Sequence, residues 1–185
     1  MKKTILATIA AAALAITSFG ASAQMKDPTV GGAAMYPNKT IVENAVNSPI
    51  HTTLVAAVKA AGLVDTLNGP GPFTVFAPTN DAFDKLPAGT VDNLVKPENK
   101  ATLTKILTHH VVPGRISSKQ LMKMIKKGNG KATLKTVQGE DLTATMSDGH
   151  IMLTDAKGGT ATVTTADVFQ SNGVIHVIDT VLMPS

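Results

Sequence analysis

Cysteine and tryptophan are absent from this chain of 185 residues, and aromatic residues make up only 3% of it. Without cysteine the protein has no disulfide, no thiolate metal ligand, no cysteine nucleophile and no lipid attached to a cysteine. With five Phe and one Tyr, a surface that stacks nucleic-acid bases is hard to assemble. Hydrophobic residues still account for 43% of the chain. The composition therefore predicts a folded domain with a real core and excludes a wholly disordered chain.

The first 23 residues have the pattern of a secretory signal peptide. Lys2 and Lys3 precede an apolar run over residues 5–16, and Ala21-Ser22-Ala23 has the A-x-A form of a cleavage site. The run is short for a membrane span, and no later stretch approaches that length. We expect residues 1–23 to be removed, the mature chain to have no transmembrane segment, and the protein to be periplasmic or secreted.

The remainder is expected to be a flexible leader followed by one domain. Residues 24–36 contain a proline and two adjacent glycines without periodic pattern, which predicts a flexible leader over 24–36 and a domain over 37–185. Helix signals then dominate up to Lys127. Thr40 and Ser117 each begin a capping-box pattern, and Ser48-Pro49 predicts another helix start.

From Lys131 onward polar and apolar residues alternate and threonine and valine are frequent, which is typical of strands. Turn signals separate the runs at Asp148-Gly149, Lys157-Gly158-Gly159 and Ser171-Asn172-Gly173. The last run, Val174–Leu182, is almost entirely apolar or β-branched and is predicted to be a central strand. Helices first and strands later predict a single α+β domain.

Three segments together resemble the fasciclin (FAS1) domain family. They are FTVFAPTNDAF at residues 73–83, HHVVPG at 109–114 and SNGVIHVID at 171–179. Their order and spacing match one complete domain over about Tyr36 to Pro184. The resemblance implies a β-wedge of two sheets with several packed α-helices, and an extracellular interaction or adhesion module that usually lacks catalytic activity. His109 stands where the family usually has tyrosine.

Most residues of these segments are explained as folding devices. Pro78 lacks a ladder donor and can end a strand, Thr79 or Asn80 can cap the next helix, and His110 is expected to be buried and hydrogen-bonded. The predicted structural motif consists of Phe76, Pro78, Thr79, Asn80, Phe83, His110, Asn172, Gly173, His176 and Asp179. Asp167-Val168 occupies the position of an Asp-Ile pair that the resemblance links to receptor binding in animal members, and it is a candidate partner-binding pair.

No catalytic or metal-binding pattern is present in the sequence. There is no G-x-S-x-G elbow, Gly128–Ala132 lacks the spacing and the Ser/Thr of a phosphate loop, and no acidic residue completes a metal site with the five histidines. We therefore predict no enzymatic activity, no metal and no cofactor.

Positive charge is concentrated in one part of the chain. Residues 99–139 hold nine basic and no acidic side chains. On a helix, Lys119, Lys123, Lys126 and Lys127 would form one cationic face. This face is either simply solvated or docks onto an anionic partner, namely an acidic polysaccharide, anionic lipid headgroups or an acidic protein patch. Export and the scarcity of aromatics argue against nucleic acid.

The sequence thus predicts an exported, non-enzymatic fasciclin-like interaction or adhesion module that binds an envelope or extracellular partner; its oligomeric state is left open. The alternative is a carrier of an apolar small molecule such as a carotenoid or lipid, because some algal fasciclin-like proteins bind carotenoids. In that case five methionines are candidates for lining an adaptable groove: Met122, Met124, Met146, Met152 and Met183.

Overall fold

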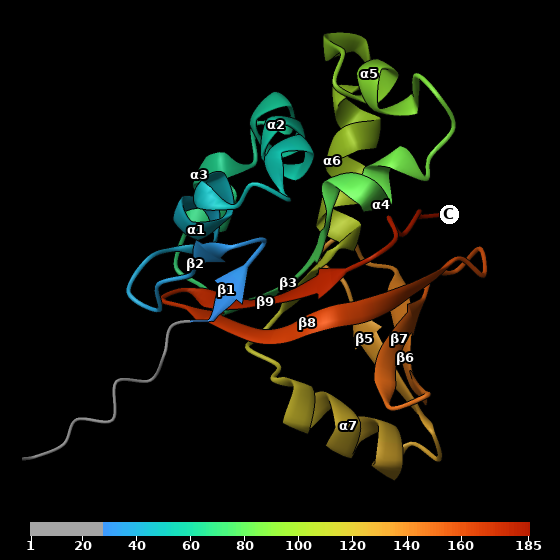
Figure 1. Cartoon of the computed structure of the whole chain (residues 1–185). Helices are drawn as coiled ribbons and strands as arrows, with labels where there is room; N and C mark the ends of the chain where they lie inside the picture. Colours follow the sequence, from blue (N-terminus) through green and yellow to red (C-terminus); the bar gives the residue numbers. More distant parts are fainter. Residues whose placement is uncertain (1–27) are drawn as a thin grey trace, which may run out of the picture.

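The structure, a computed structural model, describes residues 28–185 and is built around a seven-stranded sheet (Figure 1). Its strands are β3 Phe73–Pro78, β4 Val111–Pro113, β5 Lys131–Lys135, β6 Asp141–Ser147, β7 His150–Thr154, β8 Thr160–Gln170 and β9 Gly173–Ile178. Their spatial order is β4-β3-β9-β8-β7-β6-β5. The pair β3–β9 is parallel and the other neighbours are antiparallel.

Helices cover both sides of this sheet unequally. They are α1 Ile41–Asn47, α2 Thr52–Ala61, α3 Val64–Asn68, α4 Asn80–Asp84, α5 Thr90–Leu94, the 3-10 helix η1 Pro97–Asn99, α6 Lys100–His109 and α7 Ser118–Lys127. Figure 1 shows α1 to α6 on one side of β3, β8 and β9, and α7 alone on the other side. The predicted capping boxes at Thr40 and Ser117 both form.

The long strand β8 divides the sheet into two halves. Its first residues, Thr160–Thr162, pair with β7, and the stretch from Val163 to Gln170 pairs with β9. The register shifts twice between Val163 and Val168, and such irregularities bend a strand and increase its twist. The α+β wedge predicted from the sequence is therefore confirmed, with β8 shared by its two sheets.

Strands β3 and β9 separate two hydrophobic cores. Because side chains alternate along a strand, Val75 and Val177 face the core under the helices, whereas Phe76 and Ile178 face the core closed by β5–β8 and α7. All six residues of β9 are buried, so its predicted central position is confirmed. The strand ends at Ile178, earlier than the predicted Leu182.

The N-terminal part of the described chain differs from the predicted flexible leader. Within residues 28–36, β1 Thr29–Val30 pairs with β2 Ala33–Ala34. Val30 and Met35 are only 4% and 2% exposed and belong to the core under the helices. Burial of these two side chains holds the segment against the core, so residues 28–36 are ordered rather than flexible. The predicted signal peptide and residues 24–27 lie outside the described residues.

The predicted helix start at Ser48-Pro49 is wrong. Ser48 is the C-cap of α1, and α2 begins at Thr52 without a side-chain cap from its own N-cap residue. Asn80 caps it from a distance: its Oδ1 accepts the N–H of Thr53 at 3.1 Å, and its Nδ2 donates to the carbonyl of Pro49. The cap thus comes from a residue 27 positions away in the chain.

Candidate interaction surface

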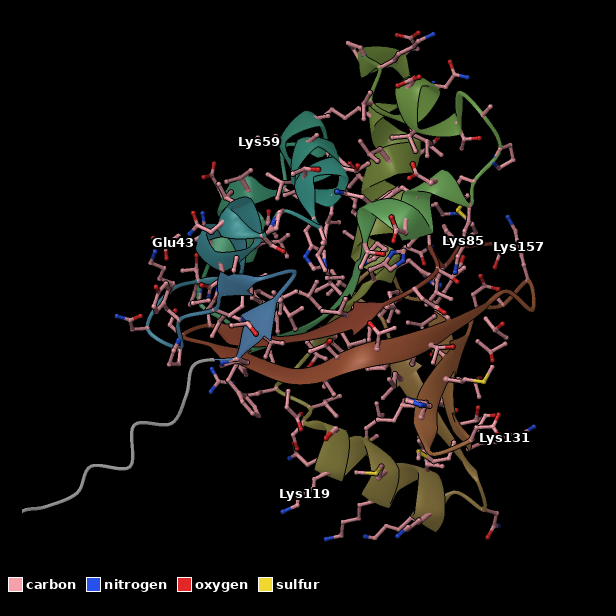
Figure 2. The ribbon with its side chains drawn as sticks, in the orientation of Figure 1. Glu43, Lys59, Lys85, Lys119, Lys131 and Lys157 are labelled. Carbon is pink, nitrogen blue, oxygen red and sulfur yellow. The ribbon has the colours of Figure 1, made fainter. Side chains whose placement is uncertain are left out.

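Helix α7 presents four lysines on the side opposite to its buried side. Leu121 and Ile125 are 0% and 2% exposed, and at 100° per residue the lysines fall on the opposite arc. We call Lys119, Lys123, Lys126 and Lys127 the α7 lysine face; all four are exposed. Figure 2 shows nitrogen-tipped side chains, with Lys119 labelled, pointing from α7 away from the sheet. The spacing of lysines along the axis is about 6 Å per helical turn of four residues.

Among the described residues, the α7 lysine face has no carboxylate partner. The ion pairs found within residues 28–185 involve Lys85 and Lys135, His109 lies 3.9 Å from Glu140, and none of these contacts involves a lysine of α7. No acidic residue occurs on α7 itself, and Lys131 continues the positive charge onto β5. A solvated face usually mixes both signs, so this surface is suited to attract an anion.

The start of α7 is anchored to the bulge of β8 by a polar circuit. Asp167 has a left-handed φ of 59°, and its carboxylate accepts the N–H of Ser118 at 2.6 Å and also the Ser118 hydroxyl. The Asp167 N–H donates to Nδ1 of His176 at 3.3 Å, and His176 Nε2 donates to the carbonyl of Ile116 at 2.8 Å. The α7 lysine face is thereby held in a fixed orientation.

These contacts bear on the expected partner-binding pair Asp167-Val168, whose binding role stays a prediction. Val168 is 0% exposed and belongs to the core under the helices, so it cannot touch a partner in this structure. Both oxygens of the Asp167 carboxylate are already bonded to Ser118. In this structure the pair packs a core and anchors a helix.

Phe76 and His176 form the centre of the motif. Both side chains are 0% exposed, and their rings stack with centroids 5.6 Å apart. Phe76 also lies opposite His176 in the parallel register of β3 and β9. Burial lowers the pKa of His176, which agrees with a neutral ring that accepts at Nδ1 and donates at Nε2.

His110 joins the end of α6 to the segment after β9. Its Nδ1 lies 2.8 Å from the carbonyl of Ile106, and its Nε2 accepts the N–H of Leu182 at 3.0 Å. Burial lowers the pKa of His110 to about 4. This neutral ring satisfies two backbone groups in the interior. His109, which stands where the family usually has tyrosine, is the last residue of α6 and is also buried.

Asn172 and Gly173 hold three segments together at one end of the sheet. Asn172 Oδ1 accepts the N–H of Ile41 at 3.0 Å, and its Nδ2 donates to the carbonyls of Leu67 and Gly69 at 2.7 and 3.2 Å. A Cβ on Gly173 would lie 2.2 Å from the carbonyl oxygen of Phe73. Only glycine allows β3 and β9 to start this close together.

The other motif residues also make intramolecular contacts. Pro78 ends β3, and Thr79 caps α4 by accepting the N–H of Ala82. Phe83 is buried, and Asp179 accepts the N–H of Thr162 at 2.8 Å. The structural role of the whole motif stays a prediction, and the contacts described above are the physical reason for holding it.

A mostly buried apolar cavity of about 70 Å³ lies between the helices and the sheet. Its walls include Met35, Leu54, Val58 and Ile175, and none of the five methionines expected to line a groove. Met124 and Met146 are exposed instead. Sites for drug-sized ligands occupy about 300 Å³ or more, so this cavity is far too small for a carotenoid.

Residues 28–185 contain neither a cluster of metal ligands nor a helix able to span a membrane. No group of three or more His, Asp or Glu side chains could hold a metal ion there. No helix in that part of the chain has both the length and the apolar character that crossing a bilayer requires.

Arg115 makes structural contacts that the sequence does not predict. Its Nη2 donates to the carbonyls of Gln170 and Ser171 at 2.9 and 3.0 Å. These partners lie more than 50 positions away in the chain. A lone arginine between a short strand and a helix carries no local signal of such a contact.

Comparison with known proteins gives consistent results. The family model of the fasciclin domain matches residues 49–184. Protein sll1483 of Synechocystis sp. is 51% identical over 159 residues, which cover 86% of this chain and 81% of that protein. The cell surface glycolipoprotein MPB83 of Mycobacterium bovis is 40% identical over 161 residues, covering 84% of this chain and 64% of MPB83.

A solved structure has the same fold. It is a FAS1 domain pair from the insect cell adhesion molecule Fasciclin I, with a TM-score of 0.68 and 22% identity, and the match covers 78% of this chain and 50% of that chain. The three sequence segments, the wedge of two sheets that share β8, and the match to the family model all agree. The chain therefore belongs to the fasciclin domain family.

Proposed function

We propose that this protein is an exported, non-enzymatic adhesion module whose α7 lysine face docks onto an anionic polysaccharide of the envelope or the extracellular space. The observation that carries the proposal is the α7 lysine face itself, four exposed lysines without a carboxylate partner among the described residues. Relatives support the setting: MPB83 is described as a cell surface glycolipoprotein, and Fasciclin I as a cell adhesion molecule.

A linear polyanion fits this surface better than a folded protein does. Protein interfaces depend on buried aromatic or aliphatic anchors. The exposed side of α7 instead offers a row of Lys119, Lys123 and Lys127, spaced about 6 Å apart along the axis, with Lys126 beside it. A polyuronate carries one carboxylate on each sugar, so successive charges can meet successive lysines. The polymer needs no pocket, because it lies along the helix.

A carrier function is not favoured. The cavity between the helices and the sheet has a volume of only about 70 Å³, and filling it with a lipid or carotenoid would require the helices to separate from the sheet.

Binding to polygalacturonate is expected to weaken steeply with salt. With four lysine contacts and a charge density like that of a single-stranded nucleic acid, affinity should fall about 50-fold between 50 and 200 mM salt. Biolayer interferometry on immobilised polygalacturonate, with a neutral glucan of equal length as control, measures this. On intact cells, the same salt range should release the protein from the surface into the medium. Binding that ignores salt, or equal binding to the neutral glucan, contradicts the proposal.

A further inference from the structure

A shallow, open hollow with polar and apolar walls lies at one end of the sheet, close to the segment that precedes α7. Its volume is about 490 Å³, within the range of sites for small ligands. Its walls include Thr40, Asn68, Pro70, Pro72, Arg115 and Ser171. These residues come from the segment before α1, the end of α3, the loop before β3, the segment before α7 and the β8–β9 turn.

The walls of the hollow are held in place before any ligand arrives. Asn172 binds Ile41, Leu67 and Gly69 and so fixes the two segments behind Thr40 and Asn68. Arg115 is fixed by its two bonds to backbone carbonyls, and the two prolines restrict the loop between them. A preformed site loses little conformational entropy when it binds.

Several hydrogen-bond donors are left available in the hollow. Arg115 uses only Nη2, so within the described chain its Nε–H and Nη1–H groups have no protein partner. Asn68 Oδ1 accepts the Thr40 hydroxyl at 2.7 Å, which leaves the Asn68 NH₂ group directed elsewhere. Ser171 is exposed and adds a hydroxyl. A set of donors beside a guanidinium is complementary to a carboxylate, which only accepts.

One acidic group lies near this hollow and limits its affinity for anions. Glu43 Oε2 accepts the N–H of Thr40 at 2.7 Å, as part of the capping box of α1. This backbone bond lowers the pKa of Glu43, so its negative charge persists. An anion in the hollow is repelled by Glu43 and attracted by Arg115; Arg115 lines the hollow and Glu43 does not, which favours the attraction.

We propose that this hollow binds the carboxylate of one acidic sugar unit, a site that selects a uronate within the polymer lying on the α7 lysine face. The inference rests on the proposed function for its partner. Arg115 precedes the first residue of α7 by three positions, so a chain of sugars along the helix reaches the hollow. The exposed rings of Pro70 and Pro72 offer apolar surface for the C–H face of the sugar.

Nuclear magnetic resonance of the labelled protein titrated with glucuronic acid tests the site directly. The Arg115 Nε–H and Asn68 NH₂ signals should shift, with at least tenfold weaker binding of glucose and of inorganic phosphate. Arg115→Gln should abolish the shift at Asn68. Arg115→Lys, which keeps the charge but loses the fork, should weaken binding about tenfold. Glu43→Gln should strengthen it severalfold.

The outcomes separate this site from the proposed function. If polygalacturonate binds with the expected salt dependence but glucuronic acid shifts nothing, the hollow is not a sugar site and the α7 lysine face acts alone. If glucuronic acid shifts both signals and the polymer does not bind, the site stands and the proposed docking falls. Equal binding of phosphate, or an unchanged Asn68 shift in Arg115→Gln, overturns the uronate assignment.

Discussion

Phe76→Ala is expected to lower the free energy of unfolding by about 3–5 kcal/mol, the largest single effect in the molecule. The ring is 0% exposed and stacks on His176 with centroids 5.6 Å apart. Its removal leaves a cavity in the core closed by α7, because neighbours on β9 and α7 cannot collapse into it. Native domains are stable by only about 5–15 kcal/mol, so this loss removes a large fraction of the total.

Urea unfolding measures this loss, with an expected fall of the midpoint of about 2 M. Phe169→Ala is the matched control, since the same atoms are removed from a side chain that is 39% exposed on β8. The control should lose less than about 1 kcal/mol. Equal losses in the two variants would show that Phe76 is no more important to the scaffold than a surface residue.

Acid is expected to destabilise the fold by roughly 3 kcal/mol between about pH 7 and pH 4, through His110 alone. The pKa of His110 is about 4 in the folded protein, lowered first by burial, against an ordinary value of 6.5. Between these values the unfolded chain binds a proton that the folded protein excludes, so stability falls as the pH falls. Burial also lowers the pKa of His51 and of His176, which act in the same direction.

The variant His110→Gln isolates this contribution. It should be less stable than the wild type at pH 7, because the bonds to Ile106 and Leu182 are weakened. The difference should shrink as the pH falls to 4.5. Stopping at pH 4.5 avoids Glu140, whose pKa is lowered to about 2 mainly by its bond to the Ser185 N–H. His150→Gln, at an exposed position, should leave the pH profile unchanged. Parallel profiles for the wild type and His110→Gln would exclude His110 as the cause.

Local signals in the sequence predicted local structure well. The boxes at Thr40 and Ser117 involve residues three positions apart, so the sequence contains the whole interaction. The sequence also predicts the buried strand after Asn172-Gly173, because an almost wholly apolar run can be buried on both faces only at the centre of a sheet.

Features that depend on distant partners could not be predicted in the same way. Asn80 caps α2 rather than its own helix, since folding places Thr53 against it. Asp167 is turned toward Ser118 by a left-handed φ within an irregular stretch of β8. No pattern of residues in the sequence predicts that backbone geometry. The hairpin at Thr29–Ala34 was missed because its two strands have only two residues each.

The candidate site also has one part that local sequence predicts and one part that depends on distant partners. The α7 lysine face followed from helical spacing and the absence of acidic residues, both visible in the sequence. The hollow beside Arg115 is assembled from five separate segments, so only the folded chain reveals it.

The central claim is that the motif builds a scaffold and the α7 lysine face does the binding. It is tested most directly by replacing all four lysines of this face with Gln (Lys119, Lys123, Lys126 and Lys127) and measuring the affinity for polygalacturonate at 50 mM salt. We predict a loss of roughly 1,000-fold, at about 1 kcal/mol for each of the four lysines, with an unchanged urea midpoint. The control exchanges four other exposed lysines for Gln, with the same change in net charge: Lys59, Lys96, Lys100 and Lys157. Full affinity in the α7 variant, or the same loss in the control, contradicts the account.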